Sequence, residues 1–491
     1  PAVDHEWSSD PLTPPGGGPW DVLIVGGGTA GLVAAHTAAG FGASTLLVER
    51  ELTGGDCLWT GCVPSKSLLA AAHVVGDARA ASALGVNVGD VSVDFAAVMR
   101  HVRSAITTIE PVDSPAALRA AGAKVARGTA LFTGPGSATV DGETVSFTQA
   151  LVTTGSSPVV PDLPGLAEVE PLTSDSVWSL TELPARLLVL GGGPIGCELG
   201  QAFARLGSTV TIVEASDRVI SQETPPASDL LERALRRDGI DVRTGVKLTS
   251  IDPDRGGRRV AVLDDGSEVD FDVVLVSVGR APGTPGLGLE AAGVALRESG
   301  HVEVDTHLRT TNPRIWAAGD LTGYPPFTHV AGNHGSLAAS NAVLGLRRSV
   351  APDLVPRVTY TSPEVASFGV AADSRPGLVV RTVPHSEVDR AIAEGDTEGY
   401  SQLVLDGRGR IVGASIVGPR AGESLAEALL AAQQGLKARS MAAAIHAYPT
   451  WSDGIWKAAL AQGRADLEAT PTKQVTTALA RLRRAWLSAR G

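Results

Sequence analysis

The sequence predicts an α/β protein in which short parallel strands alternate with helices, and three observations support this fold class. The chain has 491 residues, of which 43% are hydrophobic, so several globular domains with large cores are expected. A strand–glycine turn–helix–strand unit occurs twice, at 21–49 and at 186–214. A second pair of matching segments, 150–158 and 274–282, has the pattern of a strand that ends in glycine.

The repeated unit follows the plan of a Rossmann-like dinucleotide-binding fold. Each copy has a GxGxxG turn and a second apolar strand that ends in glutamate. The first glycine permits the tight turn, the second lets the backbone approach a pyrophosphate, and the third lets helix and strand pack closely. The helix N-terminus attracts phosphate, and the acid binds a ribose diol. The candidate residues are Gly26, Gly28, Gly31 and Glu49 in the first copy and Gly191, Gly193, Gly196 and Glu214 in the second.

Two plain glycine-rich turns are the alternative interpretation, but they do not explain both glutamates. The matching strand–glycine segments indicate where the chain passes between domains. Residues near 156–279 are expected to form the second dinucleotide domain, inserted into the first, which resumes through the segment 311–320. The pattern changes after Pro352, where a third domain begins. Residues 1–19 have no basic start and no apolar core, so they indicate a flexible lead rather than a secretory signal.

Composition argues against several classes of function. The net charge of −12 argues against nucleic acid as a main partner. No run reaches the roughly 18 apolar residues of a membrane span. Without an export signal the expected location is the cytoplasm, where disulfides are usually transient and catalytic. Residues 466–491 form a basic amphipathic helical tail, for which packing on the protein's own surface is favoured over contact with anionic lipid.

Two of the three cysteines, Cys57 and Cys62, are separated by four residues in the stretch GGDCLWTGCVPSKSLL. This is not the spacing of a zinc ribbon, and no second pair exists, so no metal-binding residues are expected. A helix with Pro64 in its first turn is expected to follow. It would place Cys62 near a helix N-terminus, where the pKa of a thiol is lowered, and Lys66 adds positive charge. The alternative is an inert disulfide or two buried thiols.

The stretch GGDCLWTGCVPSK resembles the redox motif of class I pyridine nucleotide–disulfide oxidoreductases, the family of dihydrolipoyl dehydrogenase, glutathione reductase and mercuric reductase. AAGD, ending at Asp320, resembles its second FAD motif, and YTSPEVASFG at 360–369 resembles the start of its dimerisation domain. The resemblance covers about residues 20–463. It implies a homodimer whose active site is shared across the interface. The implied layout is an FAD-binding domain in two parts, 20–155 and 280–353, an NAD(P)-binding domain at 156–279 and an α+β dimerisation domain at 354–465.

The resemblance also implies roles for individual residues. Cys62 would face the flavin and form the charge-transfer thiolate, and Cys57 would be the interchange thiol that meets the acceptor. Lys66 would lie near flavin N5 and pair with Glu198. NADH is favoured over NADPH as the donor. The residues implied to bind FAD or NAD(H) are Gly26, Gly28, Gly31, Glu49, Gly54, Gly55, Lys66, Thr154, Gly155, Gly191, Gly193, Gly196, Glu214, Gly279 and Asp320.

One segment departs from the family pattern. The disulfide reductases have His-x-His-Pro-Thr followed by a glutamate, and the second histidine, supplied by the other subunit, is the acid–base. This chain reads HAYPTWSD, with Tyr448 at that position and Asp453 in place of the glutamate. Tyrosine titrates near pH 10, so it is a poor proton shuttle at neutral pH. His446 either takes over this role or is structural, and the structural role is favoured.

These observations lead to one hypothesis and two alternatives. The hypothesis is a homodimeric FAD-dependent enzyme that passes electrons from NADH, through FAD and a Cys57–Cys62 disulfide, to a non-standard acceptor. That acceptor is a metal ion, as in mercuric reductases, or a quinone. The mercuric reductases share the tyrosine, but their C-terminal vicinal cysteine pair is missing here. The alternatives are dihydrolipoyl dehydrogenase or another small-disulfide reductase, and an FAD/NAD redox sensor without rapid turnover.

Overall fold

The computed structural model describes residues 7, 12–14 and 16–490. Residues 1–6, 8–11, 15 and 491 lie outside the described residues, and with them most of the expected lead. The chain divides into two compact units, which are described separately. The first unit holds the described residues up to 78 together with 90–215 and 239–352, and the second holds 79–89, 216–238 and the chain from 353 onward.

The first sheet of the first unit carries the first glycine-rich turn. Its strands are β1 (Trp20–Val25), β2 (Thr45–Glu49), β3 (Lys124–Arg127), β4 (Ala130–Gly134), β5 (Ser137–Val140), β6 (Glu143–Val152) and β17 (Ile315–Ala317). They lie in the order β3–β2–β1–β6–β5–β4, with β17 also paired to β6. The strands around β1 are parallel and buried, which explains their continuous apolar runs. Strands β4 and β5 add an antiparallel ribbon.

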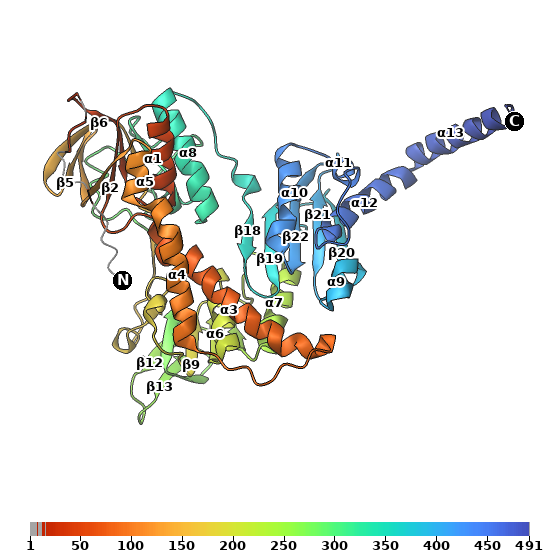
Figure 1. Ribbon diagram of the computed structural model, residues 1–491, viewed down its shortest axis with the longest axis horizontal. Coiled ribbons are helices and arrows are strands. Elements are labelled where there is room, and N and C mark those ends of the chain that lie inside the picture. The colour runs from red at the N-terminus through yellow and green to blue at the C-terminus, as the bar shows by residue number, and fades with distance from the viewer. Residues whose placement is uncertain (1–6, 8–11, 15, 491) are drawn as a thin grey trace. The chain divides into compact units, whose positions relative to one another are not determined.

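Strand β17 confirms the predicted insertion of one domain into another. It pairs in parallel with β6, so the chain returns to the first sheet after a long excursion. Helices α1 (Thr29–Gly40) and α8 (Thr328–Leu344) pack against each other, although they are almost 300 residues apart in the sequence (Figure 1). The N-terminal and C-terminal parts of the first dinucleotide fold therefore pack together, through α1 and α8 and through β6 and β17.

The excursion contains the second dinucleotide fold. Its parallel strands are β8 (Leu172–Thr173), β9 (Arg186–Leu190), β10 (Thr209–Glu214), β11 (Asp241–Thr244) and β15 (Val273–Val276). They lie in the order β11–β10–β9–β15–β8, and α6 (Pro194–Leu206) follows β9 through the second glycine-rich turn. A separate antiparallel sheet consists of β12 (Leu248–Asp252), β13 (Arg259–Leu263) and β14 (Glu268–Phe271). The short strands β7 (Ser156–Pro158) and β16 (Arg280–Pro282) pair where the chain enters and leaves this fold.

The cysteine stretch forms two consecutive helices, α2 (Gly55–Trp59) and α3 (Cys62–Ala80). Because α3 begins at Cys62, the predicted position of this thiol at a helix N-terminus is confirmed. Two further helices, α4 (Phe95–Asp113) and α5 (Pro115–Ala120), lead to β3. The short 3-10 turns are η1 (Ala81–Leu84), η2 (Ala167–Val169), η3 (Val177–Ser179), η4 (Asp320–Thr322), η5 (Pro352–Leu354) and η6 (His385–Glu387).

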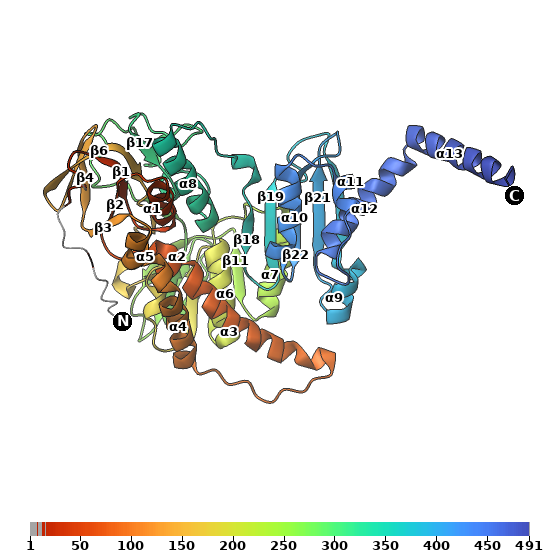
Figure 2. The same cartoon turned by 45° about the horizontal axis from the view of Figure 1, so that its top comes forward.

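The second unit is built on an antiparallel sheet, the α+β architecture predicted for the C-terminal part. Its strands are β18 (Arg357–Thr359), β19 (Glu364–Gly369), β20 (Val379–Pro384), β21 (Tyr400–Leu405) and β22 (Ile411–Gly418), in the order β18–β19–β22–β21–β20. Helix α10 (Ala421–Gln433) packs on β19 and β22, and α12 (Asp453–Glu468) packs on β20 and β21 (Figure 2). The other helices of this unit are α7 (Pro225–Arg237), α9 (Asp389–Glu394), α11 (Ala438–Ala442) and α13 (Thr470–Ser488).

The basic tail is helical, as predicted, and α13 follows α12 after a single residue. From 472 to 490 every described side chain of the tail is exposed. The expected packing on the protein's own surface is therefore not present within this unit. In the part of the chain that the structure describes, no helix is long and apolar enough to cross a membrane.

Candidate active site

The turn between β1 and α1 brings the backbone close to where a pyrophosphate would lie. Gly26 has a φ of +105°, where a side chain would be strained. A Cβ on Gly31 would stand 1.9 Å from the carbonyl oxygen of Gly26, so the helix can approach the turn only with glycine here. The hydroxyl of Thr153 donates to the same oxygen at 2.8 Å. Gly28 directly precedes α1 and provides no side-chain cap, so the backbone N–H groups at this helix N-terminus can bind an anion.

The turn between β9 and α6 repeats this geometry. Gly191 has a φ of +106°, and a Cβ on Gly196 would stand 2.0 Å from the carbonyl oxygen of Gly191. Among the described residues, no atom lies within 4 Å of the position that a Cβ on Gly193 would take. Both turns therefore fit the pyrophosphate of a dinucleotide, one beside each parallel sheet.

The two glutamates predicted to bind ribose lie at equivalent places. The backbone N–H of Gly27 donates to Glu49 Oε2 at 2.6 Å, and that of Gly192 donates to Glu214 Oε2 at 2.6 Å. Each carboxylate is thus held at the carboxyl end of its strand, beside its own glycine-rich turn. This is the position from which an acid can accept hydrogen bonds from a ribose diol.

Three further predicted residues lie where the chain crosses between the two sheets. Thr154 Oγ1 donates to the carbonyl oxygen of Gly283 at 2.7 Å, and the N–H of Gly283 donates to the carbonyl oxygen of Gly155 at 2.9 Å. Gly155 and Gly279 have φ values of +64° and +145°. Only residues without a Cβ adopt such angles easily, so the crossing depends on these glycines.

The cysteine pair is described here as two free thiols. Cys57 lies in α2 and Cys62 is the first residue of α3. The sulfur of Cys62 lies 3.2 Å from the hydroxyl oxygen of Thr328, at the start of α8. Gly54 and Gly55 precede the pair at φ +103° and +56°. In the described part of the chain, no group of three or more His, Cys, Asp or Glu side chains is arranged to hold a metal ion.

The pKa values of the two thiols are shifted in opposite directions. A hydrogen bond from the Cys57 thiol lowers the pKa of Cys62 to about 6, although burial acts in the other direction. The Thr328 hydroxyl and the charge of Lys66 lower the pKa of Cys62 further. The same hydrogen bond, together with burial, raises the pKa of Cys57. At neutral pH Cys62 is therefore the thiolate, and Cys57 keeps its proton.

Lys66 lies one helical turn beyond Cys62 and forms an ion pair with Glu198 of α6. The distance from Lys66 Nζ to Glu198 Oε2 is 2.7 Å. The Glu198 side chain is 7% exposed and that of Lys66 is 38% exposed. Because a buried carboxylate is stable only with a partner, this pair fixes the direction of the Lys66 side chain and connects α3 to the second dinucleotide fold.

A guanidinium group that the sequence analysis did not identify links the redox helix to Asp320. Arg280 Nε donates to Ser156 Oγ at 2.7 Å, and its Nη2 donates to the Ser156 carbonyl oxygen at 2.8 Å. The same guanidinium forms an ion pair with Asp56 of α2 and lies 3.7 Å from Asp175 Oδ1. Ser156 Oγ in turn donates to Asp320 Oδ2 at 2.7 Å. Four segments of the first unit therefore meet at Arg280.

Asp56 occupies an unusual electrostatic environment within this group. Burial raises the pKa of Asp56 to about 6, against the lowering effect of Arg280, and Asp175 and Asp320 raise it further. The carboxylate is therefore ionised at neutral pH, and it loses its charge as the pH falls through about 6. The only sequence signals for this pair were their positions, Asp56 directly before Cys57 and Arg280 directly after Gly279.

His446, in the segment that departs from the family pattern, has contacts on both ring nitrogens. His446 Nε2 lies 2.8 Å from Glu427 Oε2, and Nδ1 lies 3.0 Å from the carbonyl oxygen of Ala444. Its ring packs against that of Trp456, with 5.3 Å between the centroids. Both ring nitrogens therefore have partners within the second unit, and the sequence analysis did not identify Glu427.

Tyr448 makes different contacts from those of His446. Its side chain is 69% exposed, and its hydroxyl donates to Asp389 Oδ2 at 2.6 Å. This hydrogen bond and the charge of Asp389 raise the pKa of Tyr448, so the phenol stays protonated at neutral pH. Asp453 is buried and accepts from the N–H and the hydroxyl of Thr450, each at 3.2 Å. The expected orienting acid is therefore the first residue of α12 and is bonded to Thr450 in the preceding turn rather than to the residue at 448.

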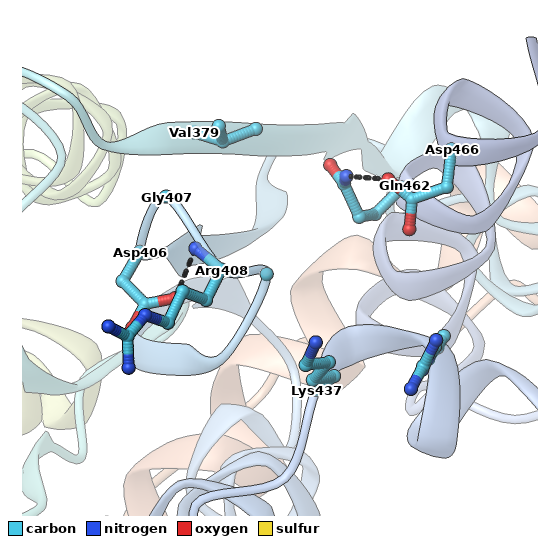
Figure 3. A pocket seen from close by; sticks show the side chains of 9 residues that line it. Val379, Asp406, Gly407, Arg408, Lys437, Gln462 and Asp466 are labelled. Carbon is cyan, nitrogen blue, oxygen red and sulfur yellow. Dashed lines mark hydrogen bonds between the residues drawn. The ribbon is translucent and has the colours of Figure 1, made fainter. Parts of the chain in front are cut away.

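A hollow of about 270 Å³ lies elsewhere in the second unit (Figure 3). The turn between β21 and β22 borders it, together with β20, α11 and α12. Its charged lining residues are Asp406, Arg408, Lys437, Arg439 and Asp466. No residue predicted for the redox or dinucleotide sites lines this hollow, so it is a separate surface feature.

Comparison with protein families matches nearly the whole chain. Residues 20–335 match the model described as pyridine nucleotide-disulphide oxidoreductase. Residues 355–459 match the dimerisation domain of the same family. The two matches fall on the parts that the sequence analysis assigned to the dinucleotide-binding and dimerisation domains.

Similar proteins of known name include two kinds of enzyme. The chain is 38% identical over 453 residues to a mercuric reductase of Streptomyces lividans, covering 90% of this chain and 95% of that protein. It is 33% identical over 466 residues to a dihydrolipoyl dehydrogenase of Chlamydia muridarum, covering 93% and 99%. Among solved structures, LpdA from Mycobacterium tuberculosis superposes with a TM-score of 0.81 at 28% identity, covering 90% and 99%. The Cu(II) complex of the HOCl-induced flavoprotein disulfide reductase RclA from Escherichia coli gives 0.80 at 26%, covering 90% and 99%.

Proposed function

Because the chain belongs to the pyridine nucleotide-disulphide oxidoreductase family, whose members are FAD-dependent enzymes that use NAD(P)H, we propose that it passes electrons from NADH to an acceptor other than a small disulfide. The favoured acceptor is a soft metal ion, as in the mercuric reductases, and a quinone is the second choice. One observation carries this proposal. Where the family's disulfide reductases have their acid–base histidine, this chain has Tyr448, a phenol that stays protonated and is bound to Asp389.

The chain's own residues fit the FAD that the family requires. The accessible N-terminus of α1 would receive the pyrophosphate, Glu49 would accept from a ribose diol, and Asp320 would hold the ribityl chain. When bound, FAD accepts a hydride from the nicotinamide and delivers two electrons to a disulfide. The other residues proposed to contact FAD are Gly26, Gly28, Gly31, Gly54, Gly55, Lys66, Thr154 and Gly155.

The nicotinamide donor is expected to be NADH. Glu214 is held at the end of β10 by the N–H of Gly192, and a carboxylate there accepts from a 2′-hydroxyl and repels a 2′-phosphate. We expect kcat/KM to be at least about tenfold higher for NADH than for NADPH, and Glu214→Ser to reduce this preference. The measurement is steady-state kinetics with both donors and one acceptor. A clear preference of the natural protein for NADPH would contradict the assignment.

The protonation state of the cysteine pair bears on the choice of acceptor. Exchange with a small disulfide requires a thiolate as the attacking group. In this structure the accessible negative charge is on Cys62, and the raised pKa of Cys57 keeps the interchange thiol protonated. A base must therefore remove the Cys57 proton before exchange. Tyrosine cannot do this at neutral pH, and both ring nitrogens of His446 already have partners.

A soft metal ion does not depend on such a base. Binding to sulfur displaces the thiol proton into water, because metal coordination requires the thiolate. The bound ion then takes two electrons as the two sulfurs form the Cys57–Cys62 disulfide, so Hg(II) would leave as Hg(0). The similarity to mercuric reductases supports this choice, as does the RclA structure, which is a Cu(II) complex of a disulfide reductase.

A panel of acceptors tests the proposal directly. With NADH, we expect Hg(II) or a quinone to be reduced at least about tenfold faster than lipoamide or glutathione disulfide. Tenfold is a lower bound, since one acid–base group contributes about 10²–10⁴-fold. Fast lipoamide turnover would instead identify a dihydrolipoyl dehydrogenase, which the 33% identity to such enzymes keeps as the second candidate. No turnover with any acceptor, despite normal reduction by NADH, would indicate a redox sensor.

The proposal includes a homodimer in which Tyr448 is supplied to the cysteine pair of the other subunit. The matched dimerisation domain supports it. Large apolar side chains near this segment are exposed in the single chain, namely Leu430, Leu436 and Ile445. The domain boundaries expected from the sequence, at 20–155, 156–279, 280–353 and 354–465, and the cytoplasmic location also remain part of the proposal.

A further inference from the structure

Helix α13 is a separate feature that electron transfer does not use. It spans Thr470–Ser488, and it begins eleven residues beyond the part that matches the dimerisation domain. From 472 to 490 every side chain that the structure describes is exposed. At 1.5 Å per residue, its 19 residues give a rod about 28 Å long. A helix with no packing in its own unit requires another explanation for its sequence.

The sequence of α13 is divided into an apolar side and a cationic side. Val475, Leu479, Leu482 and Trp486 recur at intervals of four, three and four residues, which places them on one side of the helix. Each of the four is exposed. Between 470 and 490 there are five cationic side chains and no acidic one, namely Lys473, Arg481, Arg483, Arg484 and Arg490. The rest of this chain is strongly acidic, because the whole has a net charge of −12.

Two cationic side chains lie beside Trp486 of the apolar side. The guanidinium carbon of Arg483 is 4.3 Å from the centroid of the indole ring, and that of Arg490 is 4.2 Å from it. Tryptophan and arginine prefer the boundary between an apolar and an aqueous phase, where the ring is buried and the charges stay hydrated. The same arrangement would suit a helix that lies flat in the headgroup region of a lipid bilayer.

We propose that α13 binds the protein to an anionic lipid surface, with its apolar side at the acyl boundary and its five cations among the headgroups. Charge complementarity selects this partner, since the helix has five cations, four of them within 481–490, and no acidic residue. Pairing with α13 of a second copy would instead bring ten cations together. The apolar side is narrow, so anionic headgroups are needed as well as burial.

Sedimentation of the FAD-loaded full chain with vesicles tests this surface. Vesicles of equal parts phosphatidylcholine and phosphatidylglycerol are expected to bind the protein, and vesicles of phosphatidylcholine alone are expected not to. Each basic residue near an anionic surface strengthens binding several-fold, so R481E/R483E/R484E should weaken it about a hundredfold or more. L479Q/L482Q should weaken it about tenfold, because apolar burial is lost. NADH oxidation without vesicles should be the same in all variants.

A matched control changes the same amount of charge elsewhere. R408E/K437E/R439E alters three cations that line the hollow of the second unit (Figure 3) and should leave vesicle binding within about twofold of the natural protein. Equal loss in this control, or failure of the natural protein to bind anionic vesicles, would overturn the proposal. Light scattering without lipid gives a second check. A larger oligomer for the natural protein than for the R481E/R483E/R484E variant would also overturn the proposal, since a second copy would then be the partner.

Discussion

Cys57→Ser is expected to abolish reduction of the acceptor, while reduction of the flavin by NADH continues at close to the natural rate. The reason is that serine cannot form a disulfide with Cys62, so electrons that reach the flavin cannot leave through the pair. The loss should exceed about 10⁴-fold in kcat, since removing a covalent redox group is more severe than the 10²–10⁴-fold effect of one acid–base group. Stopped-flow absorbance of the flavin separates this step from steady-state turnover.

The two cysteines should differ in their titration as well as in their roles. The Cys57 thiol supplies the largest contribution that lowers the pKa of Cys62 to about 6. Alkylation by iodoacetamide in the reduced protein should therefore fall to half its maximal rate near pH 6 at Cys62, with the reactive thiolate present above this pH and lost below it. In Cys57→Ser the midpoint should rise, because the largest cause that lowers it is lost, whereas in Cys62→Ser burial still raises the pKa of Cys57, so the remaining thiol should react slowly at neutral pH. Equal reactivity of both thiols at pH 7 would contradict the assigned roles.

The reliably predicted parts of this protein are those that local chain geometry dictates. Gly26 and Gly31 could be identified from the sequence because no other residue fits a φ of +105° or a Cβ 1.9 Å from a carbonyl oxygen. The position of Cys62 at the start of α3 followed from Pro64 in the first helical turn. The insertion of one dinucleotide fold into another followed from the matching strands, and the pairing of β17 with β6 confirms it.

Contacts between distant segments could not be predicted in the same way. Arg280 meets Asp56 and Ser156 across separations of 224 and 124 residues, and one sequence carries no signal for such a pairing. The partners of His446 and Tyr448 were missed for the same reason, since Glu427 and Asp389 lie on other helices, 19 and 59 residues away. For Asp453 the position was predicted from the sequence, but its contact was not. It occupies the expected position in the sequence, but Thr450, in the turn before α12, engages its carboxylate.

Tyr448 has the second large effect that we expect, because it stands where the disulfide reductases have their acid–base. Tyr448→Phe removes the hydrogen bond to Asp389 without changing the ring, and Asp389 keeps its ion pair with Lys457 at 3.0 Å. If the phenol donates a hydrogen bond to the acceptor or contacts a soft metal ion, kcat for the preferred acceptor should fall at least about tenfold. Flavin reduction by NADH should not change. Asp389→Asn is the matched control, because it keeps the phenol and alters only its partner.

Tyr448→His should have the opposite effect on small disulfides. An imidazole titrates near pH 6.5 and can remove the Cys57 proton that the phenol leaves in place. Turnover of lipoamide or glutathione disulfide should therefore rise several-fold. The gain should stay well below the full 10²–10⁴-fold of an acid–base group, because Asp453 is bonded to Thr450 and is not free to orient the new ring. His446→Ala should have little effect, since both nitrogens of that ring are already engaged. If the natural protein turns over lipoamide rapidly and His446→Ala abolishes that activity, the base is His446 instead. If the Tyr448→Phe variant equals the natural protein with every acceptor, Tyr448 is a packing residue.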